Sequence, residues 1–149
     1  MLISIIGENC SGKSTLANRI RDAIDAEIIT GRDYLRMARS EAEAGLLLRE
    51  KLANAVSGGN IIYVISEPDQ LSLLPEDAIR ILVNADLDTI KARFRARMRG
   101  ILPVPVERML ESKHGMFDDR TYDYRYDGVN GDAPTLCEQL RRIDINTEV

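Results

Sequence analysis

The sequence predicts an α/β fold in which a five-stranded, mainly parallel sheet carries helices on both faces. Short apolar stretches of strand length alternate with helical stretches along most of the chain. The most apolar strands suit the buried centre of a parallel sheet, whereas the more polar ones suit its edges. This distribution favours the strand order 2-3-1-4-5. Strands are expected at residues 2–6, 26–30, 60–65, 78–83 and 122–126.

The helices of the first half are marked by their boundaries. A helix over residues 13–24 follows a loop rich in glycine and small residues. Ser40 and Glu43 then form the Ser-x-x-Glu pattern of a capping box, which predicts the start of a long helix. Gly58 and Gly59 predict its end, because glycine readily adopts the left-handed backbone that follows a helix.

In the second half, a helix is expected over residues 86–99, and Gly100 ends it. A shorter helix follows Pro103 and stops at Gly115, with basic residues in its last turn. The fifth strand alternates aromatic and charged residues, as expected for a strand with one buried face. Pro134 opens the final helix.

Composition limits the classes of function. The 149 residues correspond to one domain, 1–149, and their formal net charge is −4. A nucleic-acid partner is disfavoured, since such binding depends on a basic face. Two cysteines and one histidine exclude a disulfide scaffold and an ordinary zinc site. No apolar run reaches the length of a membrane span. We expect a soluble, cytoplasmic monomer or small homo-oligomer without a membrane partner.

The most informative motif is Gly7-Glu8-Asn9-Cys10-Ser11-Gly12-Lys13-Ser14, a complete G-x-x-x-x-G-K-[ST] sequence. The glycines let successive backbone N–H groups point inward around a phosphate, and the following helix adds its positive end. Lys13 can reach the β- and γ-phosphates, and Ser14 can bind Mg²⁺. The expected nucleotide-binding residues are Gly7, Glu8, Asn9, Cys10, Ser11, Gly12, Lys13, Ser14 and Thr15.

This motif defines a P-loop. A chance match is expected in roughly 0.5% of chains of this length, and here the motif also lies between a buried strand and a helix, as it must. The sequence therefore predicts a three-layer P-loop NTPase fold that binds ATP with Mg²⁺. Cys10 departs from the usual glycine or alanine; we interpret it as a tolerated loop residue, with an acidic, oxidisable thiol as the alternative.

After the second strand, Thr30-Gly31-Arg32-Asp33-Tyr34-Leu35-Arg36 resembles the nucleoside monophosphate kinases (adenylate- and cytidylate-kinase-like) and the shikimate-kinase-like phosphotransferases. In the former an arginine of this stretch holds the acceptor phosphate, and in the latter an aspartate orients the acceptor hydroxyl. The resemblance implies an acceptor-binding helical insert at residues 31–59. It makes Thr30, Arg32, Asp33 and Arg36 candidate acceptor-binding residues, with Asp33 also catalytic.

Ser66 and Glu67 end the third strand, where related proteins place an aspartate near Mg²⁺. Glu67 is therefore a candidate metal-site residue together with Ser14, and the alternative is that Glu67 caps a short helix. Residues 130–134 follow the fifth strand, where related kinases pass backbone along the adenine ring. This last correspondence is one of position only.

The resemblance also implies a small lid over residues 100–120. Arginines crowd the helix before it, and Arg93/Arg97 form a pair at i,i+4 spacing. Lid arginines close over the transferring phosphoryl group in such kinases, which makes Arg97 and Arg120 catalytic candidates beside Lys13. For the remaining arginines a solvated face is the simpler interpretation, and His114 is most simply a helix-terminal residue.

These observations predict an ATP-dependent phosphotransferase whose acceptor is a nucleoside or nucleotide. Two alternatives remain at this point. One is a kinase of a small metabolite alcohol, and the other is a non-kinase ATP-binding or ATPase module, including a degenerate kinase fold that only binds nucleotide.

Overall fold

The computed structural model describes residues 1–147, except for the side chains of residues 56, 57 and 145–147. The strands are β1 (Leu2–Ile6), β2 (Glu27–Thr30), β3 (Ile61–Ile65), β4 (Ile79–Asn84) and β5 (Tyr124–Asp127). The α-helices are α1 (Lys13–Ile24), α2 (Glu41–Ser57), α3 (Leu87–Arg97), α4 (Val104–Lys113) and α5 (Ala133–Thr147). Two 3-10 helices, η1 (Asp33–Met37) and η2 (Pro68–Leu73), complete the described elements.

All five strands are parallel, and their order is β2-β3-β1-β4-β5. The predicted strand order and fold class are therefore confirmed. Every residue of β1 and β3 is buried, whereas the edge strands β2 and β5 have two exposed residues each. The apolar character of each strand thus matched its distance from the edge, because only central strands are covered on both faces.

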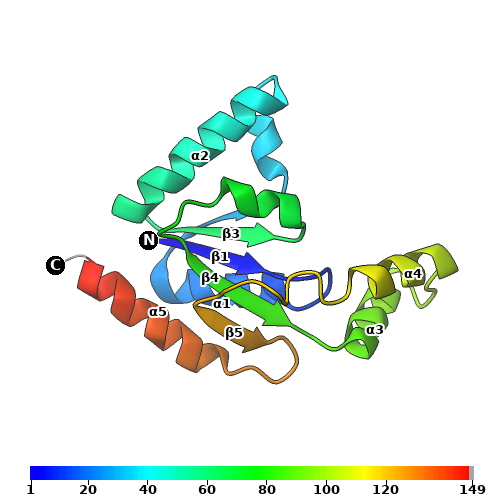
Figure 1. The fold of residues 1–149 in the computed structure, drawn as a ribbon. Coiled ribbons are helices and arrows are strands. Elements are labelled where there is room, and N and C mark those ends of the chain that lie inside the picture. The colour runs from blue at the N-terminus through cyan, green and yellow to red at the C-terminus, as the bar shows by residue number, and fades with distance from the viewer. Residues whose placement is uncertain (148–149) are drawn as a thin grey trace.

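Helices cover both faces of the sheet (Figure 1). On one face, Ile3 and Ile5 of β1 pack with α1 and α5 in a core that includes Ile20 and Leu140. Alternate residues of the same strands point to the opposite face and pack against α2 and the two 3-10 helices. The sheet is thus the middle of three layers, with one core on each of its faces, as the sequence predicts.

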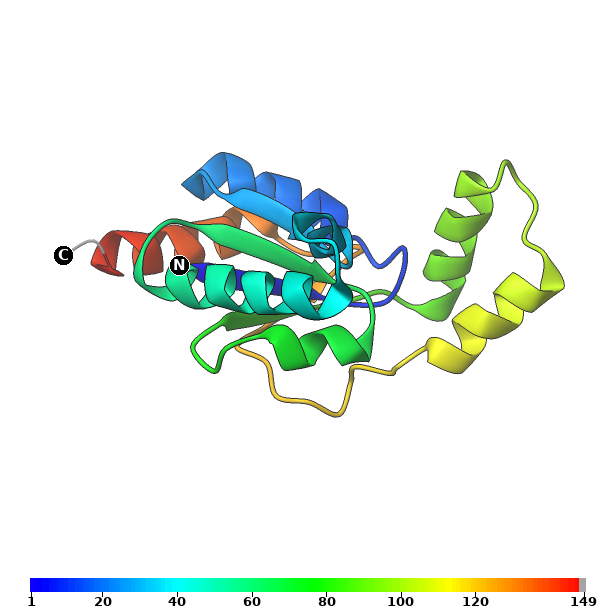
Figure 2. The same cartoon turned by 90° about the horizontal axis from the view of Figure 1, so that it is seen from above.

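The helices α3 and α4 form a hairpin that projects beyond the carboxyl end of the sheet (Figure 1, Figure 2). Lys91 joins them, since its Nζ donates to the carboxylates of Glu107 at 3.2 Å and Glu111 at 2.7 Å. Ile90 and Leu110 are buried in a small cluster at the base of the hairpin. The predicted lid, residues 100–120, corresponds to the distal part of this hairpin and its return to the sheet.

Local sequence signals predicted the elements correctly, with small shifts in their bounds. The Ser40 hydroxyl accepts a hydrogen bond from the Glu43 backbone N–H at 3.1 Å and caps α2 as expected. The segment of Asp33 and Arg36 forms a 3-10 helix, in which residues three apart still share a face. Strand β5 begins two residues later than predicted and spans Tyr124–Asp127. Within residues 1–147, no helix combines the length and apolar character needed to cross a bilayer.

Candidate nucleotide-binding site

The phosphate loop connects β1 directly to α1 at the carboxyl end of the sheet. The Gly7 N–H donates to the Ile65 carbonyl at 3.2 Å, which ties the start of the loop to the end of β3. A Cβ on Gly7 would lie 2.6 Å from the Val83 carbonyl oxygen, so only glycine fits. Gly12, with φ +112°, turns the chain into α1 as its N-cap. The loop therefore wraps around the helix N-terminus, as the motif predicts.

Lys13 lies inside this loop. Its side chain is buried, and its Nζ donates to the carbonyls of Gly7 at 2.7 Å and Glu8 at 2.6 Å. Burial lowers the pKa of the ammonium from 10.5 to about 8, although the nearby Glu8 opposes that shift. The positive charge is thus held in a poorly solvated position, where a bound phosphate would be its natural counter-ion.

A cavity of about 110 Å³ opens in front of the loop. It brings together residues from four separate parts of the chain, including Thr30 at the end of β2, Ser66 after β3 and Arg97 at the end of α3. The side chain of Ser14 reaches the same cavity from the first turn of α1. Its lining residues are Asn9, Cys10, Gly12, Lys13, Ser14, Thr15, Thr30, Val64, Ser66 and Arg97.

A second cavity of about 250 Å³ adjoins the first and shares Cys10, Gly12, Thr15 and Arg97 with it. Its other lining residues are Leu16, Arg93, Tyr126 and Gly128. The pair Arg93/Arg97, expected from the i,i+4 spacing, therefore faces the nucleotide loop from α3.

Arg93 joins three segments at this second cavity. Its guanidinium donates to the Cys10 carbonyl at 3.1 Å and to the Gly128 carbonyl at 2.8 Å. Gly128 itself packs so tightly on the phosphate loop that a Cβ would overlap the Ser11 carbonyl. Sequence reasoning missed Gly128 and Tyr126; the pair Asp127-Gly128 at a strand end signalled a turn, but the contact with the loop exists only in three dimensions.

One buried hydroxyl of the loop has no partner. Among the described residues, the Ser11 Oγ is the fully covered side-chain polar atom without a hydrogen bond. A buried unsatisfied hydroxyl costs about 1–3 kcal/mol, and such groups are rare in folded proteins. The loop therefore carries a buried ammonium that is bound by backbone carbonyls and a buried hydroxyl without a partner.

The predicted acceptor residues lie apart from these cavities, with the exception of Thr30. Asp33 and Arg36 are exposed on η1, and Arg32 forms an exposed ion pair with Glu41 at 3.5 Å. The base of η1 is fixed, because the Tyr63 hydroxyl donates to the Gly31 carbonyl at 2.7 Å. Burial raises the pKa of that Tyr63 hydroxyl, which therefore stays protonated as a donor.

Glu67 occupies the N-cap position of η2 and also carries an ion pair. Its carboxylate accepts from Lys113 Nζ at 3.0 Å. The turn before η2 is held by the buried Gln70, whose Oε1 accepts from the backbone N–H groups of Ser66 at 3.2 Å and Glu67 at 3.3 Å. Both predicted roles of Glu67 are therefore compatible with its position, next to Ser66 at the edge of the cavity.

Arg120 is in different surroundings from those expected for a phosphate clamp. Arg120 is exposed, and its Nη1 donates to the Met116 carbonyl at 3.1 Å. His114 is the C-cap of α4, as expected, and its Nδ1 lies 3.0 Å from the Glu8 carboxylate. Of the two predicted lid arginines, Arg97 lines the cavity and Arg120 does not.

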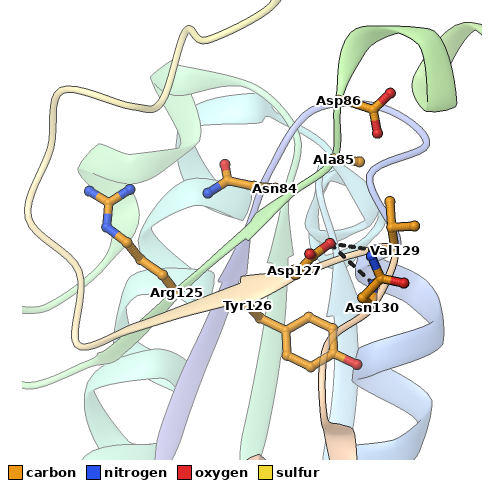
Figure 3. A pocket seen from close by; sticks show the side chains of 8 residues that line it. All are labelled: Asn84, Ala85, Asp86, Arg125, Tyr126, Asp127, Val129 and Asn130. Atoms are coloured by element: carbon orange, nitrogen blue, oxygen red, sulfur yellow. Dashed lines mark hydrogen bonds between the residues drawn. The ribbon is translucent and has the colours of Figure 1, made fainter.

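A further cavity of about 520 Å³ lies at the carboxyl ends of β4 and β5 (Figure 3). Its side chains are mostly polar and include Asn84 and Arg125. The Asp127 carboxylate is already occupied, because it accepts from the N–H groups of Val129 at 2.8 Å and Asn130 at 3.2 Å. This cavity borders the loop after β5, and its lining residues do not include Lys13 or Ser14.

The phosphate loop, the sheet order and the projecting helical hairpin together define a P-loop small-kinase fold, and solved structures agree. An uncharacterized protein from Eubacterium ventriosum matches with a TM-score of 0.67 at 16% identity, over 96% of this chain and 98% of its own. A sugar kinase from Janibacter matches with a TM-score of 0.63 at 18% identity, over 93% of this chain and 90% of its own. The YorR protein from Bacillus subtilis, in complex with phosphorylated GDP, matches with a TM-score of 0.60 at 20% identity, over 96% of this chain and 95% of its own.

A gluconokinase and several shikimate kinases share the same fold. At such identities the likeness concerns the fold, and the chemistry has to be argued from this chain's own residues. No protein-family model matches the sequence. No curated protein matches it either.

Proposed function

We propose that the chain is an ATP-dependent kinase that transfers the γ-phosphoryl group to a small acceptor, most simply a nucleoside or nucleotide. The observation that carries this proposal is the cavity in which Lys13 and Ser14 of the phosphate loop meet Arg97 from the projecting hairpin. Phosphoryl transfer needs positioning and cations for the charge that spreads over the γ-phosphoryl oxygens. A loop lysine and an arginine from another segment meet that requirement.

The adjoining cavity supports a nucleoside end beside the phosphates. Arg93, Tyr126 and Gly128 form its wall at the side of α3 and β5. A guanidinium held by two backbone carbonyls is rigid, and it offers a flat cationic surface on which a base can stack. In this proposal the nucleoside of ATP lies against Arg93, and its phosphates extend along the loop toward Lys13.

The residues present fit a magnesium ion held mainly by phosphate oxygens and water. Hard oxygen donors are what Mg²⁺ prefers, and the hydroxyl-bearing residues Ser14, Ser66 and Thr30 line the cavity. Among the described residues no group of three or more His, Cys, Asp or Glu side chains could cage a metal, which agrees with an ion that arrives with its nucleotide. Ser14 would bind the ion, with Glu67 nearby; Mg²⁺ would neutralise charge on the β- and γ-phosphates.

The acceptor would approach from the η1 side. Arg36 could hold an acceptor phosphate, and Asp33 could orient an acceptor hydroxyl, since both are exposed there on one face. Thr30 connects this side with the cavity lined by Lys13, Ser14 and Arg97 (the phosphate cavity). The phosphorylated nucleotide in the YorR structure supports a nucleotide acceptor.

A small alcohol is the second candidate acceptor, because sugar, gluconate and shikimate kinases share the fold. In that case Asp33 would be the main acceptor contact, and Arg36 would have a minor role. The two candidate acceptors therefore differ in their main contact, which is Arg36 for a nucleotide and Asp33 for a small alcohol.

The proposal is tested by ADP release from Mg·ATP with and without a panel of nucleosides, nucleotides and small alcohols. Acceptor-dependent release supports a kinase, and release that no acceptor changes supports an ATPase. Absence of heat in calorimetry with Mg·ATP, Mg·GTP and their diphosphates would remove the proposal altogether.

Substitution of Arg36 separates the two acceptor classes. If the acceptor is a nucleotide, Arg36→Ala should raise its KM about tenfold or more, because a charged hydrogen bond to phosphate is lost, and leave the ATP KM nearly unchanged. Arg39→Ala, an exposed arginine of the same segment, is the matched control. Equal effects on both KM values would remove Arg36 from the acceptor site.

A further inference from the structure

The segment at the carboxyl end of α4 makes three polar contacts with the body of the protein, two with the phosphate loop and one with Glu67 after β3. Lys113 Nζ donates to the Glu67 carboxylate at 3.0 Å. The Glu8 carboxylate uses both oxygens, one 3.0 Å from His114 Nδ1 and the other accepting from the Gly115 N–H at 3.2 Å. An acid of the phosphate loop and an acid after β3 therefore hold the same short stretch of the lid.

This stretch is anchored on its other side by the core. Phe117 is fully buried among residues of the α2 face, and its carbonyl accepts from the Tyr122 hydroxyl at 2.6 Å. Gly115, with φ +82°, makes the turn between the helix end and this anchor. The position of Lys113 is thus fixed by contacts on both sides.

Glu67 places the ammonium of Lys113 close to the phosphate cavity. Ser66, its neighbour in sequence, lines the cavity together with Lys13 and Ser14. Lys113 is therefore joined through Glu67 to the segment that forms the rim of this cavity.

The Lys113–Glu67 pair is of the kind that contributes little to folding. The two side chains are 37% and 41% exposed, and ion pairs so accessible to water are weak. A γ-phosphate with two negative charges is a stronger partner for a lysine than one carboxylate is. An exchange of partners would consequently cost the fold little.

We propose, on the basis of the proposed function, that Lys113 is a catalytic residue that contacts the γ-phosphoryl group, and that Glu67 holds it in place until the nucleotide binds. In the transfer, an acceptor oxygen forms a bond to the γ-phosphorus. A phosphate oxygen of a nucleotide acceptor attacks as the anion and releases no proton, whereas a hydroxyl acceptor gives its proton to the Asp33 carboxylate. The bond to the β–γ bridging oxygen breaks, and ADP leaves with that electron pair. Lys113 forms no covalent bond and moves no proton; it neutralises charge on the equatorial oxygens. It takes the second-cation role that the sequence suggested for Arg120.

The test compares a ligand that has a γ-phosphate with one that lacks it, so it needs no acceptor. The affinities of Mg·AMP-PNP and Mg·ADP are measured by calorimetry for the natural protein and for Lys113→Met and Lys113→Gln. The affinity for Mg·AMP-PNP should fall roughly tenfold, as expected for one lost hydrogen bond to a charged group, and that for Mg·ADP should change less than about twofold. A purely structural ion pair would not separate the two nucleotides.

Lys51→Met provides a matched control. Lys51 pairs with Glu27 at 2.8 Å, and the side-chain exposures are 39% and 53%. This pair lies at the β2 edge of the sheet and lines neither the cavity of Lys13 nor that of Arg93. This variant should leave both affinities unchanged. Lys113→Arg should recover part of the Mg·AMP-PNP affinity, because it keeps the charge.

The outcomes separate this inference from the proposed function. If the natural protein binds neither nucleotide, the proposed function itself fails. If it binds both and Lys113→Met and Lys113→Gln weaken them equally or not at all, Lys113 does not contact the γ-phosphate and only this inference is overturned. A selective loss of Mg·AMP-PNP affinity in both variants supports it.

Discussion

Replacement of Lys13 by methionine should make the nucleotide-free protein more stable while it abolishes polyphosphate binding. Lys13 is buried, and its pKa lies near 8 instead of 10.5 because its ammonium is poorly solvated. A methionine of similar length keeps the apolar packing of the side chain and removes the charge. The substitution therefore separates what the Lys13 charge costs in folding stability from what it contributes to polyphosphate binding.

The magnitude follows from the pKa. Each unit of lowering corresponds to about 1.36 kcal/mol, so the charged form of Lys13 costs the folded state roughly 3 kcal/mol at neutral pH. Hydrogen bonds to the carbonyls of Gly7 and Glu8 are lost in the variant, which offsets about 1 kcal/mol. Lys13→Met should thus gain roughly 1–3 kcal/mol in unfolding free energy, which for a chain of this size is a rise in Tm of a few degrees.

The pH dependence gives the sharper measurement. Between about pH 8 and 10.5 the unfolded state keeps the Lys13 proton, whereas the folded state has lost it. Stability therefore rises with pH in this window, and the contribution of Lys13 between pH 7 and pH 10 is about 2–3 kcal/mol. Urea unfolding of both proteins at pH 7 and pH 10 isolates this contribution as the difference between their two slopes.

Two results would refute the reasoning. If Lys13→Met is less stable than the natural protein at pH 7, the ammonium is a stabilising part of the loop, and burial is not its dominant environment. If the two proteins show the same dependence on pH up to pH 10, the pKa of Lys13 is not lowered. Binding of Mg·ADP, measured in parallel, should be lost in the variant in either case.

Two further substitutions test the second cavity. Gly128→Ala should lower both the unfolding free energy, by about 1–3 kcal/mol, and the Mg·ADP affinity, because the new Cβ overlaps the phosphate loop. Gly45→Ala on α2 is the control, because its new Cβ meets nothing within 4 Å, and it should stabilise the protein by about 0.5–1 kcal/mol. Equal shifts in the melting temperatures of the two variants, measured by calorimetry, would contradict this. Arg93→Ala removes both hydrogen bonds to backbone carbonyls and should weaken Mg·ADP binding about tenfold or more, whereas exposed Arg95→Ala should not; similar affinities of the two variants would remove Arg93 from the site.

The charge arrangement links the fold to the proposed reaction. Lys13 is kept in the loop at a cost to stability, and the Ser11 hydroxyl is buried without a partner. A ligand with several phosphate oxygens would offset the cost of the buried Lys13 charge. We therefore expect nucleotide binding to raise the melting temperature more in the natural protein than in Lys13→Met, by mass action on the folded state.

The sequence was informative wherever function and fold are determined by neighbours along the chain. The phosphate loop could be read directly, because its glycines, lysine and serine act within eight successive residues. Strand order could be inferred because burial on both faces demands apolar residues, as in β1 and β3. The i,i+4 pair Arg93/Arg97 was predictable for the same reason, since helical spacing alone puts both on one face.

The structure decided what depends on segments distant in the chain. The contact of Gly128 with Ser11 and the pairing of Lys113 with Glu67 join residues 117 and 46 positions apart, respectively. Neither pair leaves a periodic pattern, because the positions that meet are set by how the hairpin and the loop after β5 fold back on the sheet. Arg97 and Arg120 looked equivalent as lid arginines, yet only Arg97 lines the phosphate cavity. Local spacing determined the elements and the phosphate loop, whereas packing of the completed chain determined which cations reach it.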